Sequence, residues 1–315
     1  MNLGELRKDY ILDRWVIISS GRSKRPKEFK QESLEIIEET CFFCPGNEKS
    51  TPSEIGRVSQ GSSWKMRWFE NKFPALTPNG QINAKTDNQF FTFASNYGHH
   101  EVIVETPDHK KQLADLSEKD IVDLFNVYKL RIKELSKKDN VAYVSIFKNH
   151  GPYGGTSLLH SHSQVMATSY VPQLVNDKLN ACRKFIECPY CKIIQVEKNS
   201  LRRCFENSTF VAFTPYASRF NFEIWIFPKH HAKNLDEVNI NDLANILKKA
   251  LVKINQLNLS YNFFLHYAPN DSDLHFHIEI IPRVAVWGGF EFCTNTIINS
   301  VSPEDAARFY RGEHE

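Results

Sequence analysis

Two stretches of the chain carry the same order of apolar and polar positions. The stretch "EVIVETPDHKKQLADLSEKDIVDL" begins at residue 101, and "EIWIFPKHHAKNLDEVNINDLANI" begins at residue 223. Each opens with a short run rich in β-branched residues, which is typical of a strand, and turns at a proline. Each then spaces its apolar residues as a helix does, in the first copy at Ile121, Leu124, Val127 and Leu130. We therefore predict a strand followed by a helix in each half.

The two copies continue in parallel beyond these helices. A second strand is predicted at "VAYVSIF" in the first copy and at "YNFFLHY" in the second, and each is followed by a His-x-His segment, "LHSHSQV" and "LHFHIEI". Strands mixed with separate helices, without strict alternation, favour an α+β fold with mainly antiparallel sheets and packed helices. The repeat predicts two domains, residues 1–176 and 177–315.

Composition and charge exclude several classes of partner. The chain has 315 residues with 39 basic and 37 acidic side chains, a net charge of +2. This balance gives no electrostatic footprint for a nucleic acid. No apolar run approaches the roughly 20 residues that span a bilayer, and the opening "MNLGELRKDY" is polar. We expect a soluble, cytoplasmic protein with neither nucleic acid nor membrane as a partner.

Two Cys-x-x-Cys pairs, "CFFC" and "CPYC", indicate metal sites. Zinc is commonly held by two thiolates and two imidazoles, and the repeat supplies a histidine pair for each cysteine pair. The predicted sets are Cys41, Cys44, His109 and His160 in the first half, and Cys188, Cys191, His231 and His275 in the second. A redox pair would need a strand–CxxC–helix context, which we see in neither copy; buried free cysteines are the other alternative. His230 could replace its neighbour as a ligand, although the gapless repeat favours His231. We expect two zinc ions per chain.

The pattern HxHxQ in "LLHSHSQV" places His160, His162 and Gln164 on one face of a predicted strand. If His160 binds zinc, His162 is held rigidly beside it. A fixed imidazole can attack phosphorus when its other nitrogen keeps its proton, and an amide such as that of Gln164 can donate to the phosphoryl oxygens. The glycine-rich loop "NHGPYGGTS" lets backbone N–H groups approach an anion. A metal site or a satisfied polar strand is the simpler explanation. The second copy lacks both the glutamine and the glycines, so we predict one active site per chain.

The segment "NHGPYGGTSLLHSHSQ" resembles the active-site loop and strand of galactose-1-phosphate uridylyltransferases, a two-repeat branch of the histidine-triad superfamily. "LRKDYILDRWVIISSGRSKRP", "CFFCPGNE", "ENKFPAL", "PDH" and "GGFEF…INSVSPEDAA" follow the order of that family. The resemblance implies two histidine-triad-like repeats and a homodimer. It implies ping-pong transfer of UMP between UDP-glucose and a hexose 1-phosphate, galactose 1-phosphate, through nucleotidyl-His162.

The resemblance also assigns binding residues. It places Arg22, Arg25, Asn71, Phe73, Asn149, Gly155 and Ser157 at the nucleotide, and Phe290 and Glu291 at the sugar. Taken alone, Arg22 and Arg25 are typical of solvated surface charges.

Some residues depart from the family pattern. Ser161 stands where many uridylyltransferases have proline, and "AVWGGF" has no lysine for the sugar phosphate. "PYASRFNFEIWIFPKHH" and the two cysteine pairs are also similar to ADP-glucose phosphorylases, which transfer an adenylyl group to inorganic phosphate. That activity, and more remotely a non-enzymatic nucleotide- or zinc-binding protein, are the alternatives.

Overall fold

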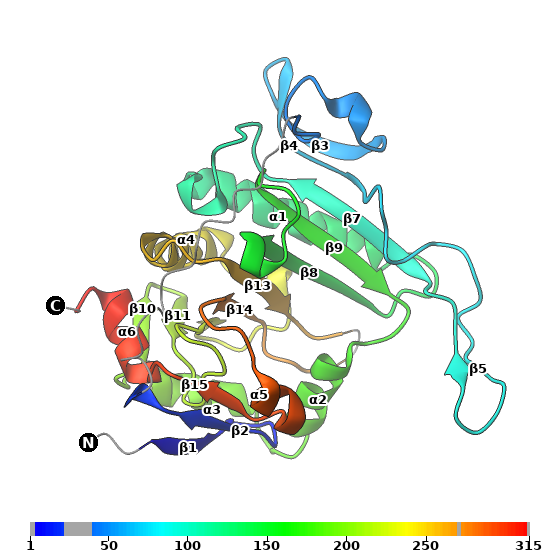
Figure 1. Cartoon of the computed structure of the whole chain (residues 1–315). Coiled ribbons are helices and arrows are strands. Elements are labelled where there is room, and N and C mark those ends of the chain that lie inside the picture. The colour runs from blue at the N-terminus through cyan, green and yellow to red at the C-terminus, as the bar shows by residue number, and fades with distance from the viewer. Residues whose placement is uncertain (1–3, 22–39, 270–271, 314–315) are drawn as a thin grey trace.

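The computed structural model describes residues 4–21, 40–269 and 272–313. Its centre is a ten-stranded sheet in which all paired neighbours are antiparallel (Figure 1). In spatial order the strands are β10 (Arg203–Glu206), β11 (Phe210–Phe213), β12 (Ile224–Pro228), β14 (His277–Pro282), β13 (Tyr261–His266), β8 (Tyr143–His150), β9 (His162–Thr168), β7 (Gly98–Val104), β4 (Ser63–Glu70) and β3 (Glu54–Gln60). The α+β class with a mainly antiparallel sheet is confirmed.

The two halves of the chain meet in the middle of this sheet. Strand β8 of the first half pairs with β13 of the second, from Tyr261 opposite His150 to Phe264 opposite Phe147. Buried apolar residues of both halves then form one continuous core. The sheet is therefore shared, and the division into residues 1–176 and 177–315 stays a prediction.

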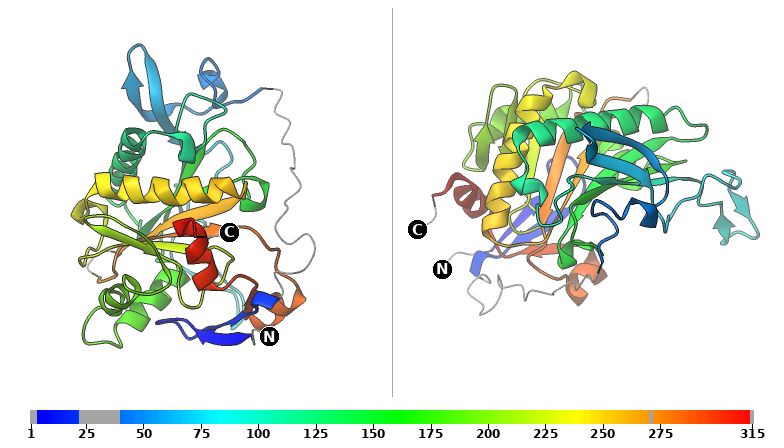
Figure 2. Two further views of the ribbon diagram at one scale, coloured as in Figure 1. Left: turned by 90° about the vertical axis from the view of Figure 1, so that its left-hand side faces the viewer. Right: turned by 90° about the horizontal axis from the view of Figure 1, so that it is seen from above.

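Helices α1 (Glu118–Leu135) and α4 (Ile240–Gln256) occupy equivalent places in the two halves and pack against each other beside the sheet (Figure 2). Ser117 begins α1 by accepting a hydrogen bond from the backbone N–H of Asp120, which satisfies a donor that the first turn leaves free. The predicted apolar stripe is buried at Ile121, Leu124 and Val127, but Leu130 is 38% exposed. The buried face instead continues through Tyr128, Arg131 and Leu135, so Leu130 lies to one side of it.

Smaller elements surround the sheet. They are β1 (Glu5–Lys8), β2 (Trp15–Ile18) and β15 (Ile297–Asn299), which form a second sheet, the helices α2 (Gln173–Cys182), α3 (Pro189–Glu197), α5 (Gly289–Thr294) and α6 (Pro303–Arg311), the hairpin β5 (Lys85–Thr86) with β6 (Thr92–Phe93), and the short 3₁₀ helices η2 (Glu48–Ser50), η3 (Leu113–Asp115), η4 (Pro152–Gly154) and η5 (Leu235–Glu237). The β5–β6 hairpin extends away from the body, at the right of Figure 1. Within the described ranges, no helix is long and apolar enough to cross a membrane.

A buried ion pair joins α1 to the sheet. Arg131 donates to both carboxylate oxygens of Glu101 on β7, from Nε at 2.7 Å and from a terminal nitrogen at 2.8 Å. Both side chains are 4% exposed. Removing one member would leave the other charge buried without its partner.

Arg131→Met should lower the free energy of unfolding by about 3–5 kcal/mol, because it isolates the Glu101 carboxylate in the interior. Lys129→Met is the matched control on the same helix, since Lys129 pairs with the largely exposed Asp236 and should change stability by less than about 1 kcal/mol. Urea unfolding of both variants gives the comparison. Equal losses in the two variants would contradict the importance of burial at Arg131.

Candidate active site

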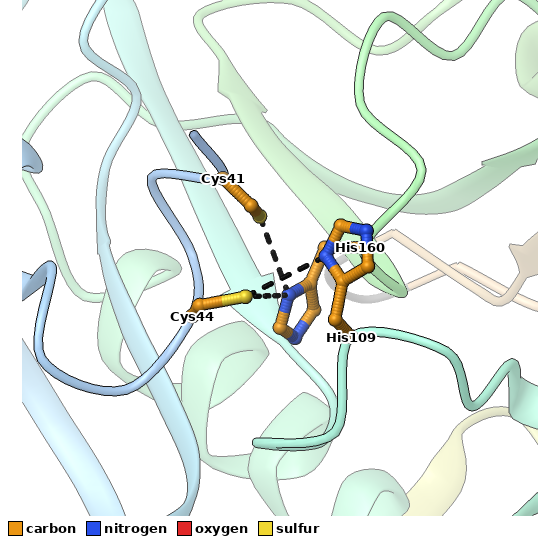
Figure 3. Close-up of side chains that lie close together, drawn as sticks. All are labelled: Cys41, Cys44, His109 and His160. Carbon is orange, nitrogen blue, oxygen red and sulfur yellow. Dashed lines mark hydrogen bonds between the residues drawn. The ribbon is translucent and has the colours of Figure 1, made fainter. Parts of the chain in front are cut away.

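The structure gathers all eight predicted metal ligands into two clusters of four. In the first, Cys41 Sγ lies 3.5 Å from His160 Nδ1, and Cys44 Sγ lies 3.5 Å from His109 Nδ1 (Figure 3). Cys44 Sγ also lies 3.6 Å from His160 Nδ1. All four ligand atoms lie within 4.8 Å of one another. Residues 119 positions apart in the sequence thus converge on one point.

The second cluster repeats this arrangement. Cys191 Sγ lies 3.5 Å from Nδ1 of both His231 and His275, and Cys188 Sγ lies 3.9 Å from His275 Nδ1. His230, the alternative ligand, instead places its Nε2 3.1 Å from the carbonyl of Glu237. Cys188 is the N-cap of α3, so the second pair does begin a helix, contrary to the expectation from the sequence. Bend and turn residues precede it in place of a strand, and two histidines face the sulfurs.

The donor sets fit a tetrahedral metal ion. Bonds of about 2.0–2.3 Å to nitrogen and sulfur separate neighbouring ligand atoms by about 3.3–3.8 Å, close to the separations found here. The outer ring nitrogens are also occupied. His160 Nε2 lies 2.7 Å from the carbonyl of Thr106, and His231 Nε2 lies 2.7 Å from Asp273 Oδ1. Such contacts keep the proton on Nε2 and leave the Nδ1 lone pair for a metal.

Strand β9 begins at His162, so His160 precedes it and is not on the strand as predicted. The backbone bends at His160, whose ring is turned toward Cys41 and Cys44. The carbonyl of His160 lies 2.8 Å from Nδ1 of His162. A carbonyl only accepts, so Nδ1 carries the proton and Nε2 of His162 keeps its lone pair.

His162 is held as a neutral imidazole. Its side chain is buried, and its ring lies edge-on to that of Phe43 with centroids 5.4 Å apart. Burial lowers the pKa of His162, and the nearby ammonium of Lys148 lowers it further. The ring is therefore unprotonated at neutral pH, as a nucleophile must be.

A buried charge network lies behind β9, and sequence reasoning missed it. Lys148 Nζ donates to Glu105 Oε2 at 2.7 Å, to Ser161 Oγ at 3.0 Å and to the carbonyl of His162 at 3.0 Å. Ser161 and Ser163 both donate to Glu105, so they face away from His162 and Gln164. The available signal was Lys148 directly after the mostly apolar "YVSIF" of the same predicted strand.

The glycine-rich loop is shaped by close packing on the second half. Gly151 and Gly155 have φ of 73° and 83°, a region that favours glycine. A Cβ on Gly151 would lie 2.3 Å from Ser260 Oγ. Asn262 donates to Asn149 Oδ1 at 2.9 Å, which fixes the amide of Asn149 with its nitrogen free to donate.

A cavity of about 240 Å³ opens at His162. It is lined by aromatic residues, among them Phe42, Phe43 and Phe69, and by five predicted site residues, Asn71, Phe73, Ser157, His162 and Gln164. A second cavity, of about 230 Å³, also includes His162, together with Asn149, His150 and Gly151. Two larger cavities, of about 660 and 500 Å³, contain none of the predicted site residues.

Of the remaining predicted substrate-binding residues, the three that the structure describes line neither cavity at His162. Gly155 belongs to the loop between them but lines neither. Phe290 and Glu291 lie on α5, away from His162, where Glu291 accepts a hydrogen bond from the backbone of Gly288. Arg22 and Arg25 lie outside the described residues.

The second copy has the same contact between a histidine ring and a backbone carbonyl, but Nε2 of its ring is not open to a substrate. His277 Nδ1 lies 2.8 Å from the carbonyl of His275, as His162 does with His160. However, Lys178 Nζ lies 2.9 Å from His277 Nε2 and pairs with Glu279. Burial, with Lys178 as the next cause, lowers the pKa of His277 to about 4. The lone pair that is open at His162 is therefore occupied at His277.

Comparison with known proteins agrees with this geometry. The model of the galactose-1-phosphate uridyl transferase N-terminal domain matches residues 2–172. An ADP-glucose phosphorylase of Arabidopsis thaliana is 38% identical, over 98% of this chain and 92% of that protein. A galactose-1-phosphate uridylyltransferase of Thermotoga maritima is 32% identical, over 98% of each chain. The crystal structure of an Arabidopsis thaliana ADP-glucose phosphorylase with bound ADP-glucose has a TM-score of 0.84 at 33% identity, covering 98% of this chain and 99% of that one. The chain belongs to the galactose-1-phosphate uridyl transferase family.

Proposed function

We propose that the chain is a UDP-glucose–hexose-1-phosphate uridylyltransferase that moves UMP to galactose 1-phosphate by a ping-pong mechanism. The observation that carries this proposal is the environment of His162. Its Nδ1 proton is held by a backbone carbonyl, and its Nε2 keeps a lone pair beside a cavity that Gln164 also lines. The Thermotoga maritima relative carries the name of this activity.

The reaction balances on His162 without an added base. Nε2 attacks the α-phosphorus, a P–N bond forms, and the P–O bond to glucose 1-phosphate breaks. The leaving sugar phosphate keeps the electron pair, while the Nδ1 proton remains on the hydrogen bond to the carbonyl of His160. Attack by the second sugar phosphate on the same phosphorus then restores the free imidazole. The amide nitrogens of Gln164 and Asn149 donate to phosphoryl oxygens as charge develops on them.

The aromatic cavity is suited to the nucleoside. Phe73 is 83% exposed at its mouth, so its ring can cover a base or ribose, and Asn71 beside it supplies an amide. Ser157 links this cavity to the phosphate loop. We include Arg22, Arg25 and Gly155 in the nucleotide site on the family resemblance alone.

We propose that both clusters bind zinc. Zinc joins cysteine and histidine ligands into a closed tetrahedral site, which stabilises the fold and takes no part in the transfer. In the first site, a zinc ion held by Cys41, Cys44, His109 and His160 would restrain His160, whose carbonyl lies 2.8 Å from Nδ1 of His162. In the second site Cys188, Cys191, His231 and His275 fasten α3 to the sheet.

We propose further that the chain acts as a cytoplasmic homodimer. Phe290 is 46% exposed, and neither it nor Glu291 reaches the cavity at His162 of the same chain. A role of these residues at the sugar would therefore be exercised at the site of a partner chain.

Adenylyl transfer to inorganic phosphate is the second candidate. The 38% identity to an ADP-glucose phosphorylase, over nearly the whole chain, favours it. The absence of a lysine from "AVWGGF" points the same way. Both candidates use His162 and differ in the base held by the aromatic cavity and in the acceptor.

His162 should become covalently nucleotidylated when the protein meets a nucleoside diphosphate sugar without an acceptor, because the reaction then stops after its first half, with the nucleotidyl group on the histidine. Intact-protein mass spectrometry should show one added nucleoside monophosphate, labile to acid, and its mass distinguishes UMP from AMP. His162→Gly should abolish turnover and the adduct. An adduct that persists in His162→Gly, or wild-type turnover of UDP- and ADP-sugars with no adduct, would rule out the covalent mechanism.

His277→Asn should leave turnover per folded molecule largely intact, because Lys178 already occupies Nε2 of this histidine. Steady-state assays would be read beside thermal unfolding, since the side chain is buried. A variant that is well folded but as inactive as His162→Gly would show that the two halves do not divide into one active and one structural site.

Elemental analysis of protein purified without added metal should find two zinc ions per chain. Cys41→Ser should lose one ion and destabilise the fold, because the binding free energy of structural zinc contributes to folding. Cys293→Ser, which alters an exposed cysteine outside both clusters, is the control and should keep both ions. Protein that lacks zinc and carries both cysteine pairs oxidised would overturn the assignment.

A further inference from the structure

A second histidine, His100, contacts the side chain of Gln164. It lies on β7, the strand next to β9, where it is opposite Met166, while Val102 is opposite Gln164. His100 and Gln164 are therefore diagonal neighbours on one face of the sheet, within reach of each other. His100 Nε2 lies 2.9 Å from Gln164 Oε1, and the histidine is only 9% exposed.

The protein fixes the tautomer of this imidazole. The backbone N–H of Ala75 donates to His100 Nδ1 at 3.2 Å. A backbone N–H can only donate, so Nδ1 is unprotonated and the proton of the neutral ring is on Nε2. His100 Nε2 then donates to Gln164, which must turn its carbonyl oxygen toward the histidine.

Asn71 also lies close to His100 Nε2, but it does not change the direction of the hydrogen bond from His100 to Gln164. The backbone N–H of Phe73 donates to Asn71 Oδ1 at 2.9 Å, so the amide nitrogen of Asn71 faces His100, with Nδ2 3.2 Å from Nε2. Both nitrogens are donors in this tautomer, so their approach is not a hydrogen bond. The shorter contact, to Gln164 Oε1, takes the proton.

We infer that His100 is a positioning residue that fixes which end of the Gln164 amide faces the phosphoryl group. With Oε1 held by His100, Nε2 of Gln164 is directed to the other side, and it has no hydrogen-bond partner within the described part of the chain. A rotated amide would present its oxygen to the negatively charged phosphoryl oxygens and would repel them. This inference rests on the proposed role of Gln164 as a donor during nucleotidyl transfer.

A double-mutant cycle on the rate of adduct formation tests the inference. Gln164→Ala should slow the single-turnover rate by about 10²–10³-fold, as the loss of a transition-state donor does. His100→Ala should slow it by about 10–100-fold, as the loss of an outer partner does, mainly in the rate constant and less in the substrate concentration for half-saturation. In the Gln164→Ala background, His100→Ala should change the rate by less than about 2-fold, because nothing remains to be oriented.

Two replacements of His100 separate orientation of Gln164 from support of the loop. The carbonyl of His100→Asn can take the place of Nδ1 and accept from Ala75, but it offers no donor to Gln164. The terminal amide of His100→Gln reaches the place of Nε2 and can donate there. Orientation predicts that the Gln variant recovers part of the rate and the Asn variant does not; loop support predicts the reverse.

His99→Ala is the matched control, because His99 is the neighbouring residue on the opposite face of β7 and its ring lies against Tyr97. It should keep the wild-type rate. Additive losses in the double-mutant cycle, or recovery by the Asn variant alone, would overturn the role of His100. Failure of the wild-type protein to form any adduct would instead overturn the proposed function, so the two failures are distinguishable.

Discussion

The hydrogen bond from His162 Nδ1 to the carbonyl of His160 links the cysteine–histidine cluster of the first half to the imidazole that we propose as the nucleophile. His160 contributes its ring to the cysteine–histidine cluster and its carbonyl to the neighbouring imidazole. A metal at that cluster would restrain the ring of His160 and, through one peptide unit, the tautomer of His162. The spacing of two residues in His-x-His is what allows both contacts. Separating the two histidines by one more residue would turn the second ring to the other face of the strand.

A buried ion pair and its hydrogen bonds hold the rear face of β9, at a place where most protein cores have apolar side chains. Burying Lys148 and Glu105 costs several kcal/mol for each ion, which their mutual attraction offsets only when the remaining donors and acceptors are also satisfied. Here Ser161 and Ser163 both donate to Glu105, and Lys148 donates to a serine and to the carbonyl of His162. Ser161 departs from the family pattern, and in this chain its hydroxyl contacts both Lys148 and Glu105. The network also places a positive charge near His162, which adds to the effect of burial in lowering the pKa of that ring.

The repeat in the sequence was sufficient to predict the two cysteine–histidine clusters but not the contacts that tune the site. A gapless repeat preserves topology, so aligning His109 with His231 transferred a spatial position from one half to the other. The contacts that were missed join residues far apart in the chain and in different elements: Lys178 with His277 at a separation of 99 residues, His100 with Gln164 at 64, and Glu105 with Lys148 at 43. No local pattern marks such pairs, because a buried lysine or histidine is recognised only when its partner is in place. The break before His162 was missed for a related reason, since the turn of His160 toward Cys41 depends on a loop more than a hundred residues away.

The two halves show how little separates an open site from a closed one. Each has a His-x-His segment whose second ring donates from Nδ1 to the carbonyl two residues before it. Each also places a buried lysine near that second ring. Lys148 approaches from behind the strand and binds the carbonyl of His162, which leaves Nε2 open to the cavity. Lys178 extends from α2 and meets Nε2 of His277 directly, with Glu279 in the place of Gln164 to neutralise it. An ammonium group on the front of the ring occupies the lone pair, whereas one behind the strand only lowers the basicity of the ring, so the direction from which the lysine arrives decides whether the histidine can meet a phosphorus atom.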